Sequence, residues 1–452
     1  MKYRRDIDVD NKSIVMLEDT PINKLIWKLS IPSFIGIISY NLYNIINTIY
    51  ISRGIGAYAA GGLAVTFPLF IFLSAISSTM GAGAASVISR ALGENNIEKA
   101  GRAAANTFVV FWGIALLITI LGLIFLSTIL FVMGVTDKLL PYANEYTRVV
   151  LIGAVTSTGF SSLIRAEGSS KYAMYQWIIP VAANMILDPI LIFAVHLGVT
   201  GAAVATVLSQ CISVAMFVYY YFLSSKTQLK IRLKYFIPDF RIIVEICSIG
   251  MPSFIQMASQ SFTIIIINNV LRKYGGDLYI STYGIVNKIT VFLIIPVQGI
   301  LQGIQPIIGY NYGAGKKQRV MQTLKYSGKL TGYYGIICYI LIVIFTKFVL
   351  YPFTSKLDII NIGTGMLKII CIGLAFSGTQ MILVSYFQAI GKSTISFVLS
   401  LCNYVLCFVP VLLIFSILGG LKLIWYAFPA SNIVSFGITY LCIVHRFREE
   451  ET

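Results

Sequence analysis

The sequence predicts an all-α membrane protein, with twelve transmembrane helices in two pseudo-symmetric bundles of six. Three observations support this prediction: a composition poor in charge, long apolar runs, and an internal repeat. Of the 452 residues, 57% are hydrophobic and only 12% are charged, which is about half the charged fraction of a soluble domain. Too few charged side chains are present to cover a water-facing surface, so most of the exterior must face lipid.

The apolar runs have the length that a membrane span requires, which is about 20 residues. Six of them predict a first bundle and six a second, and they cover residues 30–51, 60–88, 104–125, 141–163, 172–193, 198–222, 242–271, 279–308, 324–345, 359–387, 395–417 and 421–444. The predicted organisation is an N-terminal segment (1–29), a first lobe (30–223), a basic connector (224–241), a second lobe (242–444) and a tail (445–452).

The distribution of basic residues predicts the orientation of these spans. The net charge of +16 comes from short loops and helix ends, with no continuous basic face that would fit nucleic acid. The loops opposite the termini hold few of the 34 Lys and Arg residues, namely Arg53, Lys138, Arg148, Arg272, Lys273, Lys347, Lys356 and Lys422. Because basic loops stay in the cytoplasm, we expect a multi-pass protein of the cell membrane with both termini cytoplasmic.

An internal repeat relates the two halves of the chain. Pro32, Ser33 and Phe34 recur as Pro252, Ser253 and Phe254, and at the same offset Gly56, Gly83 and Gly93 recur as Gly276, Gly303 and Gly313. An offset of six helices preserves topology, so the halves are parallel repeats. In transporters built this way the solute site lies between the halves, and alternating access comes from rocking one half against the other.

Four stretches carry a resemblance to a known family. They are 21–56, with IPSF followed by NLYNIINTIYISRGIG; 81–100, GAGAASVISRALGENNIEKA; 184–189, NMILDP; and 305–316, QPIIGYNYGAGK. In this order they resemble the multidrug and toxic compound extrusion (MATE) transporters, and most of all their MepA-like bacterial branch. The resemblance implies two six-helix lobes around a central cavity, and export of amphipathic, cationic compounds in exchange for H⁺ or Na⁺.

Almost all of the 18 Asp and Glu residues lie in loops, at span ends or in the tails, and Asp188 is the exception, inside the fifth predicted span. A charge at mid-span costs roughly 3 kcal/mol on insertion scales, so such a residue is a functional hypothesis by default. Asn184 lies one helical turn before it, and Pro189 cannot donate a hydrogen bond, which frees the carbonyl of Met185. These oxygens suit Na⁺ or a proton. The alternative is that Asp188 only hydrogen-bonds a neighbouring helix.

The family resemblance adds further residues to this cation-coupling site. It implies that Thr206, in the sixth span, joins Asn184 and Asp188. Asn47 stands where the family commonly has an Asp, and Gln260 where its Na⁺-driven branch has a Glu. Both replacements keep oxygen ligands but remove a titratable proton, which leaves Asp188 as the main carrier. Pro32 either bends the first helix during transport or marks a simple kink or helix start.

Aromatic and thioether side chains suit a promiscuous cavity for cationic guests. We therefore expect substrate contacts from Tyr40, Tyr43, Phe67, Met80, Phe160, Met257, Gln260 and Phe262, with lipid-facing or core packing as the alternative for each. Lys288 lies inside a span, where it either snorkels or pairs with a carbonyl, or takes part in coupling or anion binding.

Other functions find less support. A flippase for a lipid-linked oligosaccharide or another amphipathic lipid remains the alternative, although only Lys288 and Lys368 would supply positive charge within the spans. The Gly-rich stretches do not fit GxxxxGK[ST], and no nucleophile–base pair indicates an enzyme. With His196 and His445 far apart and the seven cysteines within apolar segments, we expect no metal centre other than Na⁺ at Asp188, no disulfide framework and no cofactor. The expected partners are small amphipathic solutes and the bilayer, and we expect a monomer.

Overall fold

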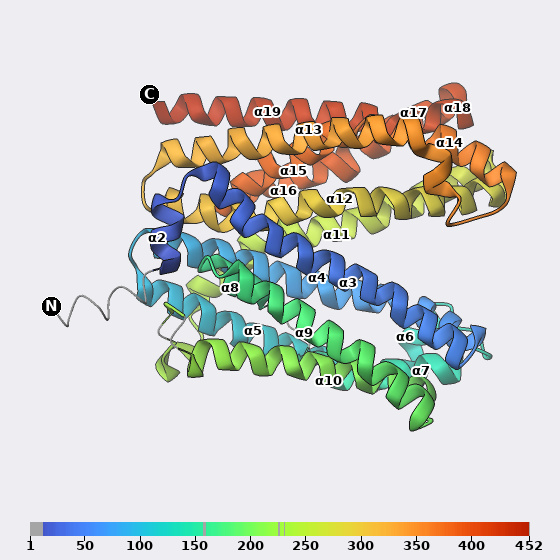
Figure 1. Ribbon diagram of the computed structural model, residues 1–452, viewed down its shortest axis with the longest axis horizontal. Helices are drawn as coiled ribbons and strands as arrows, with labels where there is room; N and C mark the ends of the chain where they lie inside the picture. The colour runs from blue at the N-terminus through green and yellow to red at the C-terminus, as the bar shows by residue number, and fades with distance from the viewer. Residues whose placement is uncertain (1–11, 157–159, 225–226, 230, 452) are drawn as a thin grey trace.

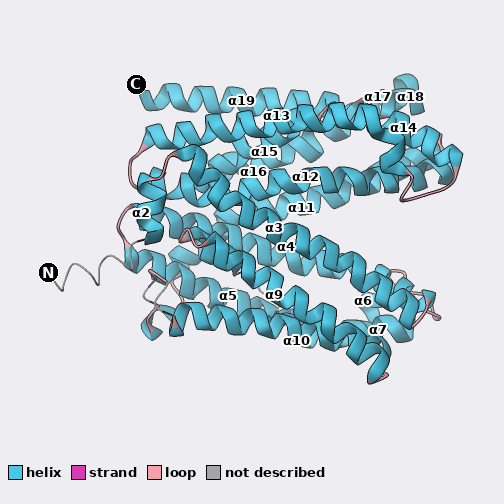
Figure 2. Ribbon diagram, in the orientation of Figure 1, coloured by secondary structure: helices cyan, strands magenta, loops and turns pink. Residues whose placement is uncertain are grey.

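A computed structural model describes residues 12–156, 160–224, 227–229 and 231–451. The described residues form helices and connecting loops, with no strand among them (Figure 2). The helices lie roughly side by side in two bundles, and the first described helix lies at the same end of the molecule as the C-terminal end of the last one (Figure 1).

The first lobe begins with a short helix that precedes the spans, α2 (Lys12–Asp19). Its spans and breaks are α3 (Ile22–Gly54), α4 (Ala57–Gly93), α5 (Ile97–Ile124), α6 (Leu126–Val132), α7 (Leu140–Ile152), η1 (Gly153–Thr156), α8 (Ser161–Ala166), α9 (Ser170–Pro189), η2 (Ile190–Ala194), α10 (Gly198–Val218) and η3 (Tyr219–Leu223). A single 3₁₀ turn, η4 (Leu233–Phe236), lies in the connector to the second lobe.

The second lobe repeats this plan in its own sequence. Its elements are α11 (Phe240–Tyr274), α12 (Gly276–Gly313), α13 (Lys317–Leu350), α14 (Leu357–Cys371), α15 (Leu374–Ala389), α16 (Ser393–Leu401), η5 (Cys402–Leu406), α17 (Phe408–Gly419), α18 (Leu421–Ile424) and α19 (Ala427–Glu451).

Eleven described helical segments are long and apolar enough to cross a membrane. The helices α14 and α15 provide a twelfth span that bends by 45° at its break. The exterior is apolar: along α5, for example, Leu116, Leu117, Ile120 and Ile124 are exposed and share one side of the helix. Because such a surface needs lipid around it, the prediction of an all-α membrane protein with twelve spans is confirmed.

Several spans differ in detail from the apolar runs. The first helix starts at Ile22 rather than near residue 30, since the polar residues ahead of the apolar run continue the same helix. Pro32 lies inside this unbroken helix and is buried. After Pro189 the fifth span widens into the π-turn η2, in which Val195 N–H donates to the Ile190 carbonyl at 2.9 Å.

The two lobes meet through α3 and α4 on one side and α11 and α12 on the other. Glycines allow the closest contacts. The carbonyl of Tyr310 occupies the space that a side chain would need at Gly93, and the carbonyl of Arg90 does the same at Gly313. Gly93 and Gly313 are equivalent positions of the internal repeat, so these two contacts are related by the pseudo-twofold axis.

These contacts lie in the halves of the helices that are nearer the termini. We call this end of the molecule the closed end. At the opposite end the helices of the two lobes diverge, with α6 and α7 on one side and α14 and α17 on the other (Figure 1). The largest hydrophobic cluster includes residues of both lobes at the closed end, such as Ile88, Ile246 and Ile307. The packed core therefore holds one end shut.

Candidate functional site

A cavity of about 300 Å³ lies between the helices of the first lobe. Its lining is polar and aromatic, and it consists of Tyr40, Tyr43, Ser74, Ser77, Ser78, Thr156, Ser161, Ser162, Arg165, Gln176, Trp177, Pro180, Val181, Asn184, Thr206, Ser209, Gln210, Ser213 and Gln302. Tyr40 and Trp177 pack edge to face with ring centroids 5.0 Å apart. We call this space the first cavity.

Behind the first cavity lies a buried acid. Asp188 is 1% exposed, and neither of its carboxylate oxygens has a hydrogen-bond partner in the described structure. Asn184, one turn earlier on α9, is 2% exposed, and both polar atoms of its amide are equally unpartnered. Buried polar atoms are normally hydrogen-bonded, so this pair leaves strong acceptors free for a ligand.

The helices that face α9 add hydroxyl and amide groups to this pair. Asn47 Nδ2 donates to Tyr43 Oη at 3.1 Å, and Tyr43 Oη lies 3.4 Å from Thr206 Oγ1. The Oδ1 atom of Asn47 has no partner in the described structure. The hydroxyls of Tyr43 and Tyr146 lie within electrostatic range of the Asp188 carboxylate.

The structure thus gathers Asn47, Asn184, Asp188 and Thr206 into one cluster, together with Tyr43 and Tyr146. We call it the Asp188 cluster. Tyr146 is missed by the sequence analysis because α7 carries no motif that singles it out. A carboxylate surrounded by amide and hydroxyl oxygens provides the hard oxygen ligands that Na⁺ prefers, and it can equally take up a proton. These residues therefore fit either coupling ion.

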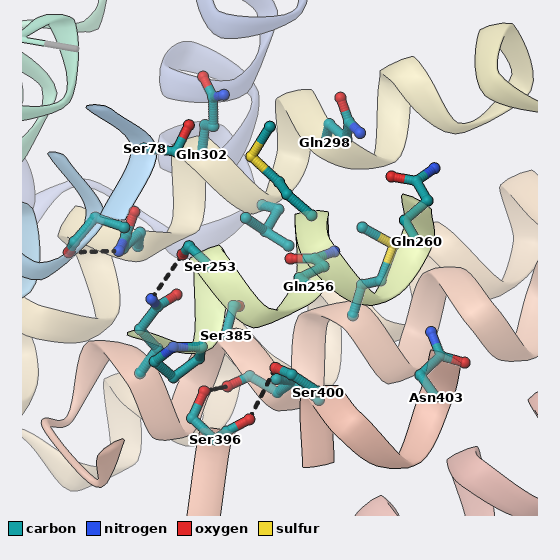
Figure 3. Close-up of a pocket in the computed structure, with 18 of the residues that line it drawn as sticks. Ser78, Ser253, Gln256, Gln260, Gln298, Gln302, Ser385, Ser396, Ser400 and Asn403 are labelled. Atoms are coloured by element: carbon teal, nitrogen blue, oxygen red, sulfur yellow. Dashed lines mark hydrogen bonds between the residues drawn. The ribbon is translucent and has the colours of Figure 1, made fainter. Parts of the chain in front are cut away.

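A second cavity, of about 400 Å³, is lined mostly by the second lobe and also by residues of α4 and α8 of the first. It is rich in amides and hydroxyls, and its lining consists of Ser78, Ala82, Ser162, Arg165, Pro252, Ser253, Gln256, Met257, Gln260, Val291, Ile294, Gln298, Leu301, Gln302, Gln305, Gln380, Met381, Val384, Ser385, Gln388, Ser396, Ser400, Asn403 and Tyr404. Figure 3 shows Gln256 and Gln260 on α11, opposite Gln298 on α12.

A comparison with known proteins identifies the fold. The MatE family model matches residues 32–190 and again residues 252–414. The chain belongs to the MATE family. It is 27% identical to the multidrug export protein MepA of Staphylococcus aureus (strain MSSA476) over 98% of both chains. It is 26% identical to MepA of Staphylococcus haemolyticus (strain JCSC1435) over 94% of both chains.

Solved structures of MATE transporters agree with this assignment. One, titled as the outward-facing conformation of a multidrug resistance MATE family transporter, superimposes with a TM-score of 0.91 at 26% identity, covering 98% of this chain and 99% of the other. Another, of MATE in the bent conformation, gives 0.91 at 27% identity, covering 97% of this chain and 98% of the other. The chain is therefore a membrane protein of the MATE family, and the relatives that it matches are named as multidrug export proteins and MATE transporters.

Of the substrate contacts expected for this MATE chain, some line one of the two cavities and the others do not. Tyr40 and Tyr43 line the first cavity, and Met257 and Gln260 line the second. The other expected contacts line neither cavity. Phe67 and Phe262 are more than half exposed, Lys288 is exposed, and Met80 and Phe160 are buried.

Packing explains why the two buried residues are not in a cavity. Phe160 lies in an aromatic cluster, with ring centroids 4.5 Å from Phe108 and 4.9 Å from Phe217. The Met80 sulfur lies 4.0 Å from that of Cys247 across the interface between the lobes. Both side chains fill the core. An apolar residue on the inner face of a span can line a cavity or pack in the core, and the sequence pattern is the same in both cases.

Arg165, a charged residue that lines both cavities, was not predicted from the sequence. The glutamines of α12 were not predicted either, although Gln298, Gln302 and Gln305 recur every three to four residues inside an apolar span. That spacing places them on one face of a helix. A row of polar residues on one face of a span could thus have predicted a cavity wall.

Proposed function

We propose that this MATE transporter exports amphipathic small molecules in exchange for H⁺ or Na⁺ bound at the Asp188 cluster. The observation that carries the proposal is the Asp188 carboxylate, which is 1% exposed and lacks any described hydrogen-bond partner. An isolated buried carboxylate is costly unless it is neutralised. A coupling ion supplies that neutralisation, and its release restores the unfavourable state.

The exchange needs a link between the ion and the substrate, and the first cavity provides one. Tyr43, Asn184 and Thr206 line this cavity and also belong to the Asp188 cluster. A cation at the cluster and a solute in the cavity would therefore contact the same side chains. Competition for these groups makes the two binding events exclusive, as an exchanger requires.

The direction of transport follows from the orientation of the spans. The bias of basic loops places both termini, and so the closed end, on the cytoplasmic face of the cell membrane. The lobes are then open to the outside, in the state that releases exported solute. Rocking the lobes about the contacts of α3 and α4 with α11 and α12 would open the other face. The proposed unit is a monomer, since both cavities lie within one chain, and it uses no cofactor.

The flippase alternative needs several positive charges around a diphosphate. Among the described residues that line the two cavities, Arg165 is the only charged one, and neither Lys288 nor Lys368 lines them. This lining favours a drug-sized solute. The family resemblance suggests a cationic solute, and the Arg165 guanidinium is the group in the lining that opposes one.

The test is ethidium transport in vesicles that contain the purified protein. A proton gradient and a Na⁺ gradient are imposed separately, and dye movement is followed by fluorescence. We expect one of the two gradients to drive transport and the other to have little effect. The proposal fails if neither gradient moves the dye while a lipid-linked oligosaccharide crosses the membrane.

A further inference from the structure

Four residues line both cavities and so form the wall that joins them: Ser78, Ser162, Arg165 and Gln302. We call this set the junction. It draws on α4 and α8 of the first lobe and on α12 of the second, and Figure 3 shows Ser78 and Gln302 next to each other. All four side chains can hydrogen-bond, so a solute that spans the two cavities meets a polar centre.

Arg165 gives the junction a positive charge that the protein does not neutralise. Its Nη1 donates to Ser161 Oγ at 3.1 Å and its Nη2 to Ser162 Oγ at 2.9 Å, both within its own helix. No described carboxylate forms an ion pair with it. Yet the residue is only 7% exposed. A buried charge without a counter-charge is unfavourable, and a guanidinium presents five N–H donors in a fork that matches a carboxylate.

The surroundings of the junction supply further donors. Gln260, Gln298 and Gln302 line the second cavity, and none of them makes a side-chain hydrogen bond in the described structure. An amide N–H₂ group supports an anion beside an arginine, while its oxygen can turn away. The residues that line either cavity include no carboxylate. A simple cation therefore finds repulsion at the junction, since the Asp188 carboxylate lies behind the first cavity and belongs to neither lining.

We infer that the junction binds the carboxylate of an amphipathic substrate, so that acidic and zwitterionic compounds are preferred over simple cations. The apolar part of such a molecule would lie in the first cavity against Tyr40 and Trp177. The two cavities, about 300 and 400 Å³, together have the volume of a drug-sized ligand. This inference rests on the proposed function, because it assigns the polarity of the exported compound.

A matched pair of dyes tests the inference by equilibrium binding. Rhodamine 110 carries a free carboxylate, and rhodamine 123 is its methyl ester. Each is titrated with the purified full-length protein in detergent, without any ion gradient, and fluorescence polarisation reports binding. We expect the acid to bind the wild type about fivefold or more tightly than the ester, as a charge-assisted hydrogen bond predicts.

Substitution of the arginine should remove this preference selectively. Arg165→Gln should weaken binding of the acid by about tenfold and change binding of the ester by less than about twofold. The matched control is Arg148→Gln, which makes the same chemical change at an exposed position outside both cavities and should alter neither dye. The inference is overturned if the wild type prefers the ester. It is also overturned if Arg165→Gln loses binding of both dyes equally, because Arg165 would then only hold α8 in place.

A second variant keeps the test decisive if Arg165→Gln does not fold. Gln302→Glu places a carboxylate in the junction, where it should pair with the guanidinium and reverse the preference towards the ester. An unchanged preference would contradict the inference. These measurements use no gradient, so they are independent of ion coupling. Ethidium export with no carboxylate preference would overturn this inference alone. A carboxylate preference without ion-driven export would overturn the proposed function alone.

Discussion

Arg90 in α4 donates a 2.9 Å hydrogen bond to Glu245 in α11, and this ion pair joins the two lobes at the closed end. Lys99 in α5 lies 3.3 Å from the other oxygen of the same carboxylate. One acidic side chain of the second lobe is thus held by two basic side chains of the first. Opening of this end requires all these contacts to separate.

The first prediction follows from this arrangement. Glu245→Gln should weaken the closed end, because the amide keeps the shape of the carboxylate but loses its charge. The groups are partly exposed, so the expected effect is at most about 1 kcal/mol, or a roughly fivefold shift in the ratio of the two conformations. Distances between spin labels on the two lobes at the closed end would measure this shift.

A second ion pair provides the control for this experiment. Glu98 and Arg102 pair at 2.8 Å within α5 alone, so Glu98→Gln removes a charge pair without touching the contact between lobes. It should leave the distance distribution unchanged. Equal shifts in both variants would show that net charge, rather than the Arg90–Glu245 contact, controls the equilibrium.

The second prediction concerns the glycine contacts at the same end. Gly93→Ala should hinder closure, since the carbonyl of Tyr310 lies where the new methyl group would be. Overpacking against backbone costs about 1–3 kcal/mol, enough to lower export about fivefold or more. Dye export at equal protein expression would measure the loss.

Gly113→Ala is the matched control, because nothing lies within 4 Å of its added methyl group. Alanine also favours the helix there, by roughly 0.5–1 kcal/mol. This variant should keep its export and unfold at a slightly higher temperature. Normal export by Gly93→Ala would argue that the lobes do not close tightly during the transport cycle.

The same glycines show what the sequence could predict. The repeat that pairs Gly93 with Gly313 was visible in the chain, and with the apolar runs it was enough to predict the helices and the two-lobed class. It could not show that each glycine contacts the other repeat, at Tyr310 and Arg90. Such contacts depend on how two bundles dock, which periodicity does not encode.

The candidate site likewise contains residues that could be predicted from the sequence and one that could not. Asp188 and Asn184 could be selected from sequence because a carboxylate within an apolar run is exceptional. Arg165 could not, since it follows the end of a predicted span, where basic residues are ordinary. Its burial arises because α8 is a short helix that packs between α4 and α9. How deeply a residue at a helix end is buried depends on the tertiary packing of that helix.

The third prediction is a pH dependence that originates at Glu167, in the loop between α8 and α9. This residue is 1% exposed, and its Oε2 accepts hydrogen bonds from Thr227 Oγ1 at 2.9 Å and Gln228 N–H at 2.8 Å. Burial outweighs these hydrogen bonds and raises the pKa of Glu167 to about 7. The folded protein therefore holds a proton that the unfolded chain releases near pH 4.5.

The sign of the effect follows from this difference in proton binding. Between pH 4.5 and about 7 the folded state binds more protons, so stability falls as the pH rises and levels off above the folded pKa. The total loss is on the order of 3 kcal/mol at most. Thermal unfolding in detergent across this range should show a decline for the wild type and a flatter profile for Glu167→Gln. Glu94→Gln, at an exposed position, should decline like the wild type.

The fourth prediction tests the coupling residue itself. Asp188→Asn keeps the size of the side chain but removes its charge, so it should abolish ion-driven export while the protein still folds and inserts. The buried site loses an uncompensated carboxylate, and the variant should be at least as stable as the wild type. Dye export under the driving gradient, together with the unfolding temperature, measures both effects.

The matched control for Asp188→Asn is Asp137→Asn, which makes the same change at an exposed position in the loop between α6 and α7. This variant should transport normally. The stability readout separates coupling from structure: if Asp188 served only to hold neighbouring helices together, its replacement would lower the unfolding temperature as well as export. Loss of export with unchanged or higher stability instead requires that the charge of Asp188 acts during the transport cycle, because a carboxylate without a hydrogen-bond partner among the described residues contributes little else.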